Sequence, residues 1–191
     1  MREAKPMTAA GQRILTAAGE LFYNRGITAV GVDLIADHSG VTKRTLYNQF
    51  GSKDHLVAAY LEEREQRWQS LVRTTIEGCE SAADAVTAPF VALRTWNQTN
   101  PRGCAFINAL AELPDPSHPA HLIAANQKHW LLNMFRDLAT AAACATPTAL
   151  ATQLLVLHEG VLATQALALD TLSVSTDLAR ALVLASTPQH P

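Results

Sequence analysis

The sequence has few of the residues from which disulfide frameworks and secretion signals are built. It contains three cysteines, Cys79, Cys104 and Cys144, which lie far apart and show no CxxC spacing. An odd number of cysteines without that spacing is typical of reduced thiols in a cytosolic protein. The N-terminal residues contain no apolar signal core, so we expect a cytoplasmic protein.

The sequence also lacks a long uninterrupted hydrophobic run and a high content of charge. Its most apolar window, residues 150–169, approaches the length of a membrane span, but His158 and Glu159 interrupt it. An ionisable pair at the middle of a membrane is costly, so we expect a helix buried on several sides instead. The charged fraction of 17% is low, which favours a large interface with a partner.

Sequence motifs that carry catalysis are absent as well. The chain has no GxSxG, no P-loop and no dinucleotide fingerprint, so we expect neither an enzyme nor a cofactor. His118, His121 and His129 span a proline-rich loop without a paired carboxylate or cysteine, which argues against a zinc site. A helical enzyme that needs no cofactor is the alternative that the sequence leaves open.

What the sequence does contain is helical periodicity, and no stretch alternates as a strand would. The 191 residues are 48% hydrophobic, enough for a real core. Apolar spacing, caps and breakers predict an all-α fold. The expected helices are a first one capped by Thr8 and ending at Arg25, then 32–38, 42–50, 53–76, 82–99, 104–113, 120–144, 147–169, and a last one with Asp177 near its start and Ser186 near its end, followed by a frayed tail.

The segment 42–50 is polar where most of the chain is apolar. Thr42 is placed to cap it, Gly51 to end it, and Leu46 with Phe50 to hold it onto a core. The preceding helix and the turn at Gly40 complete a helix-turn-helix, whose second helix enters the DNA major groove. The remaining side chains would then face DNA: Lys43, Arg44, Thr45, Tyr47, Asn48 and Gln49.

These residue types suit DNA recognition. Arg and Lys pair with guanine edges, and Asn and Gln pair with adenine edges, so Lys43, Arg44, Asn48 and Gln49 are the candidates for base contacts. Thr45, Tyr47 and Lys53 are the candidates for phosphate contacts. Residues 1–53 carry a net charge of +3 and the remainder −5, which agrees with a DNA-reading head on an acidic body. The alternative is a surface helix with an ordinary polar face.

The N-terminal part of the sequence resembles a known family. Residues 8–60, with "LFYNRG" and "IADHSGVTKRTLYNQFGSK", are similar to the DNA-binding head of the tetracycline-repressor-type (TetR) transcriptional regulators. The resemblance implies a head over 1–52 and a helical ligand-binding and dimerisation body over 53–191. It further implies a homodimer, formed through the last two long helices, that represses a palindromic operator until a small-molecule effector releases it.

The head departs from the family pattern at one position. Members often begin the second helix with Thr or Ser, which caps the helix and contacts a phosphate, whereas this chain has Gly31. A dimeric ligand-binding protein with a weakened or non-functional head is therefore an alternative. Asp33 follows closely, and we do not expect it to contact DNA because it would repel phosphate.

The resemblance also implies a ligand pocket between the middle helices of the body. An apolar pocket with a few polar groups could be formed by Trp96, Cys104, Phe106, Asn108, Trp130, Asn133, Met134 and His158. For each aromatic residue and for Met134, ordinary core packing is the favoured alternative, whereas Asn108 is an amide on an otherwise apolar helix and needs hydrogen-bond partners if it is buried. Cys104 could be a redox switch or an inert buried thiol, and His158–Glu159 could be a pocket pair or a dimer-interface pair.

Overall fold

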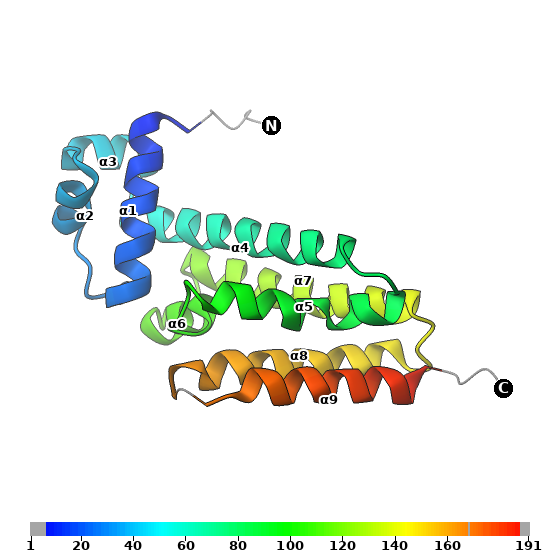
Figure 1. Cartoon of the computed structure of the whole chain (residues 1–191). Coiled ribbons are helices and arrows are strands. Elements are labelled where there is room, and N and C mark those ends of the chain that lie inside the picture. The colour runs from blue at the N-terminus through cyan, green and yellow to red at the C-terminus, as the bar shows by residue number, and fades with distance from the viewer. Residues whose placement is uncertain (1–6, 168, 188–191) are drawn as a thin grey trace. The chain divides into compact units, whose positions relative to one another are not determined.

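The computed structural model describes residues 7–167 and 169–187, and within them all regular structure is helical (Figure 1). The all-α prediction is therefore confirmed, and no helix in this part of the chain is long and apolar enough to cross a membrane. The elements are α1 (Ala9–Arg25), α2 (Val32–Ser39), α3 (Lys43–Phe50), α4 (Lys53–Glu77), α5 (Ala82–Asn97), α6 (Ala105–Glu112), α7 (Pro119–Ala141), α8 (Pro147–Thr164), the 3₁₀ turn η1 (Gln165–Leu167) and α9 (Thr171–Ser186).

The chain forms two compact units. The first comprises Met1–Arg64 with Ala105–Ala124, and the second comprises Glu65–Cys104 with Ala125–Pro191. The long helix α4 and the helix α7 each contribute residues to both units. The functional boundary after residue 52 stays a prediction, because compactness and function divide a chain by different criteria.

The first helices begin where hydroxyl side chains can cap them. Thr8 Oγ1 accepts from the Gly11 amide at 3.0 Å, and Thr42 Oγ1 accepts from the Thr45 amide at 3.2 Å. Ser52 Oγ does the same for the His55 amide at 3.1 Å. These bonds satisfy amides that have no partner inside the helix, so the starts of α1, α3 and α4 follow from local sequence.

Helices α1, α2 and α3 pack around one small core (Figure 1). Ile14, Ile35 and Leu46, one from each helix, have no exposed surface. Gly40 ends α2 with φ 65° and ψ 36°, a left-handed conformation that glycine adopts without steric cost. This turn sets the direction in which α3 leaves α2.

In the second unit α8 and α9 lie side by side, and α9 also packs on α5 (Figure 1). Phe90 of α5, Phe135 of α7 and Leu154 of α8 are completely buried in the shared core. Large apolar side chains nevertheless remain exposed on the last two helices, including Val156 and Leu184.

Two predicted boundaries near the C-terminus are wrong. Helix α8 ends at Thr164 and continues as η1, so it does not reach residue 169. Helix α9 begins at Thr171, six residues before Asp177, because the carboxylate of Asp170 accepts from the Ser173 amide at 3.3 Å and caps it. The predicted fraying of residues 188–191 concerns positions outside the described residues.

Gly103 permits a close approach between two backbones in the second unit. Its φ is +72°, and a Cβ built there would lie 2.5 Å from the Leu162 carbonyl oxygen. We expect Gly103→Ala to lower the free energy of unfolding by about 2–4 kcal/mol, because strain and overlap add. Urea denaturation at fixed protein concentration measures this effect.

The matched control is Gly78→Ala. A Cβ at Gly78 meets only ordinary contacts, the nearest at 3.6 Å, and its φ lies outside the left-handed region. A loss of stability that is equal in the two variants would contradict the overlap at Gly103.

Candidate functional site

Helix α3 presents two opposite faces. Leu46 is fully buried and Phe50 is half-buried, whereas Arg44 and Asn48 are exposed. At 100° per residue, Arg44 and Asn48 point almost directly away from the Leu46–Phe50 side of the helix. The structure therefore places one cation and one amide at the centre of the exposed face, with Tyr47 (47% exposed) and the half-buried Thr45 beside them.

The two edges of this face are tied to neighbouring helices. Lys43 forms an ion pair with Asp33 of α2. Gln49 Oε1 accepts a hydrogen bond of 2.8 Å from the hydroxyl of Thr8, the residue that caps α1. Both side chains are exposed, and their contacts with DNA stay predictions. In this structure their polar groups already have partners within the protein.

Lys53 lies half-buried at the start of α4. Its ammonium group donates to the Ile27 carbonyl oxygen at 2.6 Å and lies 6.0 Å from the centre of the Phe22 ring. Burial lowers the pKa of Lys53, and the nearby charges of Asp54 and Glu112 oppose that effect. An ammonium group has three donors, so the predicted phosphate contact would use a donor other than the one that holds Ile27.

Glu112, the last residue of α6, holds the loop between α1 and α2. Its Oε2 accepts from the Thr28 amide at 2.8 Å and from the Thr28 hydroxyl at 3.0 Å. The two residues are 84 positions apart in sequence, and both belong to the first unit. Helix α6 thus supports the loop that leads into the helix-turn-helix.

Gly31 caps α2 without a side-chain hydrogen bond. Its φ is −83°, and a Cβ built there meets no atom within 4 Å. The missing hydroxyl is therefore a property of the residue and not a constraint of the fold, because a serine would fit.

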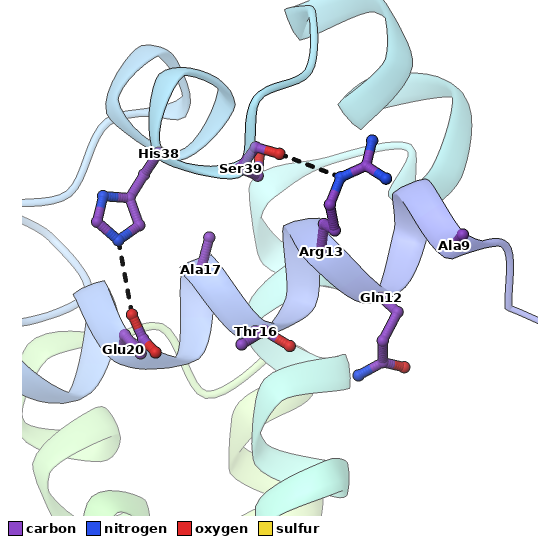
Figure 2. Close-up of a pocket in the computed structure, with 8 residues that line it drawn as sticks. All are labelled: Ala9, Gln12, Arg13, Thr16, Ala17, Glu20, His38 and Ser39. Atoms are coloured by element: carbon purple, nitrogen blue, oxygen red, sulfur yellow. Dashed lines mark hydrogen bonds and ion pairs between the residues drawn. The ribbon is translucent and has the colours of Figure 1, made fainter.

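A groove of about 510 Å³ lies between α1 and the end of α2 (Figure 2). Figure 2 shows the two interactions that cross it, Arg13 Nε to the Ser39 carbonyl oxygen at 3.4 Å and His38 Nε2 to Glu20 Oε2 at 3.5 Å. None of the seven residues predicted to contact DNA lines this groove. The groove lies where α1 and α2 meet and is separate from the exposed face of α3.

The structure divides the predicted pocket residues between the two units. Phe106 and Asn108 lie on α6 in the first unit, where Phe106 is buried. Asn133 is exposed on α7. The others gather around one cluster of the second unit that contains Trp68, Leu93 and Val161. They are Trp96, Cys104, Trp130, Met134 and His158, whose ring is tilted against that of Trp68.

A chain of polar groups runs along the edge of that cluster. Lys128 Nζ lies 2.7 Å from Glu159 Oε2 and donates to Cys104 Sγ at 3.3 Å. Glu159 Oε1 lies 3.3 Å from His158 Nδ1. Burial alone would raise the pKa of Glu159, but the His158 hydrogen bond and the Lys128 charge together lower it. Both interpretations of His158–Glu159, a pocket pair and a dimer-interface pair, stay predictions.

His158 is 2% exposed, and this burial lowers its pKa even though Glu159 opposes the effect. The unfolded chain, with an ordinary pKa near 6.5, therefore binds a proton at pH values where the folded chain does not. The stabilising contribution is complete above about pH 6.5 and is lost as the pH falls below it, by up to about 1.4 kcal/mol per pH unit.

We expect His158→Gln to flatten this pH dependence. Urea denaturation at pH 7, 6 and 5 measures it, and this range stays above the region where Glu159 titrates. Equal slopes for the two proteins would show that His158 does not carry the effect.

Sequence reasoning missed several of these residues. Trp68 follows the charged stretch "EEREQR". Leu71 and Val72, three and four residues further along the helix, give the apolar spacing that could have identified its buried ring. The Glu112–Thr28 and Thr8–Gln49 bonds join distant positions, and no local pattern predicts them.

These features define a helix-turn-helix protein with a helical body, and comparisons with known proteins agree. The family model of the bacterial regulatory proteins of the tetR family matches residues 14–60. The solved structure of SCO4454, a TetR-family transcriptional regulator from Streptomyces coelicolor, is 30% identical in sequence, with a TM-score of 0.82 over 93% of each chain. The chain therefore belongs to the TetR family of DNA-binding transcriptional regulators.

Two curated relatives match different lengths of this chain. The regulator YjdC of Escherichia coli K12 is 25% identical over 153 residues, which is 78% of this chain and 79% of that protein. The transcriptional activator FasR of Mycolicibacterium smegmatis is 40% identical over 82 residues. That match spans 41% of this chain and only 37% of the length of FasR.

Proposed function

We propose that this protein is a cytoplasmic homodimeric repressor that a small-molecule effector releases from a palindromic DNA operator. The observation that carries the proposal is the division of α3, in which Arg44 and Asn48 are exposed opposite the buried Leu46. A helix held this way offers a guanine-reading and an adenine-reading side chain to the major groove.

The last two helices support the homodimer. Val156, Val174 and Leu184 are 65%, 59% and 70% exposed on α8 and α9. Helices α8 and α9 pack on each other, and exposed apolar patches on a protein surface often mark interfaces with a partner. A twofold axis through this face would pair it with itself.

Helix α4 provides the route by which an effector could act. It is continuous from Lys53, directly after the Gly51–Ser52 turn, to Glu77, and it carries Trp68 in the body. A ligand that tilts this helix would change the spacing of the two α3 helices. Only a difference in affinity between the two states can drive the shift, and a complete switch requires about 5.5 kcal/mol.

Selection of bound DNA from a random pool tests the proposal. We expect an enriched palindrome with half-sites about one helical turn apart, bound with a strong dependence on salt. A screen for small molecules that release this DNA then tests the effector. A flat selection would refute the regulator and favour a ligand-binding protein with a non-functional head.

One observation favours that second candidate, the bare N-cap at Gly31. We expect Gly31→Ser to raise DNA affinity about tenfold, because its hydroxyl caps α2 and can donate to a phosphate, a charge-assisted bond of about 1.5 kcal/mol. Titration of the selected operator measures the change. Gly31→Ala, which lacks the hydroxyl, is the matched control, and equal affinity of the two variants would contradict the missing contact.

The direction of regulation is a separate question. The relative FasR is named a transcriptional activator, so an activator is the alternative to the repressor. A reporter gene placed behind the selected operator, with and without this protein, distinguishes the two.

A further inference from the structure

His158 lies at the centre of an aromatic cluster contributed by three other helices. Its ring centroid lies 5.6 Å from that of Trp68 on α4, 6.0 Å from Phe90 on α5 and 6.2 Å from Phe135 on α7. All four residues belong to the second unit. A polar ring in such a place must have its hydrogen-bonding atoms satisfied or bear a cost.

The contact with Glu159 determines the state of this ring. A carboxylate only accepts hydrogen bonds, so His158 Nδ1, 3.3 Å from Glu159 Oε1, carries the ring proton. The ring is neutral, because burial and the Lys128 charge lower the pKa of His158. Its Nε2 therefore presents a lone pair, which is a hydrogen-bond acceptor.

Two atoms of the cluster have no hydrogen-bond partner among the residues that the structure describes. They are Nε2 of His158, an acceptor, and Nε1 of Trp68, which can only donate. Both are fully buried, and a buried donor or acceptor that stays unsatisfied destabilises the fold. The cluster therefore contains one unpaired hydrogen-bond donor and one unpaired acceptor. A chemical group that accepts one hydrogen bond and donates another would satisfy both.

A hydroxyl group has this property. Its oxygen accepts one hydrogen bond and donates another, and with both bonds made it spans up to about 6 Å. The ring centroids of Trp68 and His158 are 5.6 Å apart, the separation of aromatic rings in direct contact, so a single hydroxyl group would have to reach the two nitrogens from beside the pair of rings.

The surroundings define the rest of the ligand. Besides His158, Trp68 packs with buried apolar residues, including Leu93 and Val161. Trp96, Trp130 and Met134 pack against these residues and are only partly buried. Part of the cluster is therefore in contact with solvent. Apolar walls with one placed polar pair are typical of small-molecule sites.

We propose that the effector of this protein is a small, largely apolar alcohol or phenol whose hydroxyl group accepts from Trp68 Nε1 and donates to His158 Nε2. This inference rests on the proposed function, because it names the chemical class that the body recognises. A buried water molecule could satisfy the same two atoms, and the experiment separates the two cases.

Isothermal titration of the full chain without DNA, using three alcohols and their methyl ethers, tests the inference. The pairs are phenol and anisole, 1-naphthol and 1-methoxynaphthalene, and cyclohexanol and methoxycyclohexane. An ether oxygen can accept from Trp68 but has no proton for His158. We expect at least one alcohol to bind about tenfold more tightly than its ether.

Substitutions locate the preference. His158→Asn keeps an amide at the position of Nδ1 for Glu159 but removes the acceptor Nε2, so the alcohol and its ether should bind equally. Trp68→Phe removes the donor and keeps an aromatic ring, which should weaken both members of the pair. His129→Asn is the matched control and should retain the preference, because it makes the same change at an exposed residue of α7.

The inference is overturned if no alcohol of the three pairs binds more tightly than its ether, which is the result expected for a site that holds water only. It is also overturned if the preference survives in His158→Asn. The DNA selection described above uses no ligand, so success there combined with failure here would reject the alcohol class and leave the DNA-binding function standing.

Discussion

Arg44→Ala is expected to lower affinity for the selected operator about 10- to 100-fold while changing affinity for unrelated DNA by less than threefold. Arg44 lies at the centre of the exposed face of α3, opposite the buried Leu46. A bidentate arginine–guanine pair contributes about 1–3 kcal/mol of discrimination. Loss of one side chain that reads a base therefore reduces the difference in affinity between operator and unrelated DNA more than it reduces the affinity for DNA in general.

Competition binding measures both quantities, with operator DNA and scrambled DNA at one fixed salt concentration. Arg73→Ala is the matched control, because it removes the same charge from an exposed arginine on α4 whose guanidinium donates to Gln69 at 3.0 Å. If Arg44→Ala discriminates as well as the wild type, or if Arg73→Ala loses as much discrimination, α3 does not read bases through Arg44.

The first four helices could be predicted closely because their ends depend on local chemistry. Thr8, Thr42 and Ser52 cap the helices that follow them, and each bond joins residues three positions apart. The start of α9 was missed because its local cap was overlooked. Its cap, Asp170, follows an apolar stretch, and the helical spacing upstream predicted that α8 would run on to residue 169.

The candidate site could be predicted only in part, because its edges depend on contacts between distant residues. The sequence showed which α3 residues are polar, but only the fold shows that Gln49 is held by Thr8, 41 positions away. The same limit applies to the body, where Trp68 and His158 meet across ninety positions of sequence within one aromatic cluster. Periodicity identifies which side of a helix is buried, but not which buried polar atoms lack a partner.

Leu178→Asp is expected to convert the protein to a monomer and to lower operator affinity more than about 100-fold. Leu178 is 49% exposed on α9, on the helix pair that also exposes Val156 of α8. A twofold interface uses the same face twice, so one substitution buries two carboxylates, and an unpaired buried charge is strongly unfavourable. A monomer has one α3, and it loses the effective concentration by which the first bound head assists the second.

Small residues on the same helices agree with close packing between subunits. A Cβ built on Gly160 of α8 meets no atom within 4 Å, and Ala163 of α8 and Ala181 of α9 are exposed. Helices with such surfaces can approach closely. Val156→Asp should therefore act as Leu178→Asp does, which provides a second variant in case one of the two does not fold.

Analytical ultracentrifugation measures the oligomeric state, and titration of the selected operator measures affinity. The control is Leu122→Asp, which places the same charge on an apolar residue of α7 that is 67% exposed, about as much as Val156. It should remain dimeric and bind the operator normally. If both α8 and α9 variants stay dimeric, or if Leu122→Asp dissociates as they do, the interface lies on another face, because each variant adds one carboxylate and only its position differs.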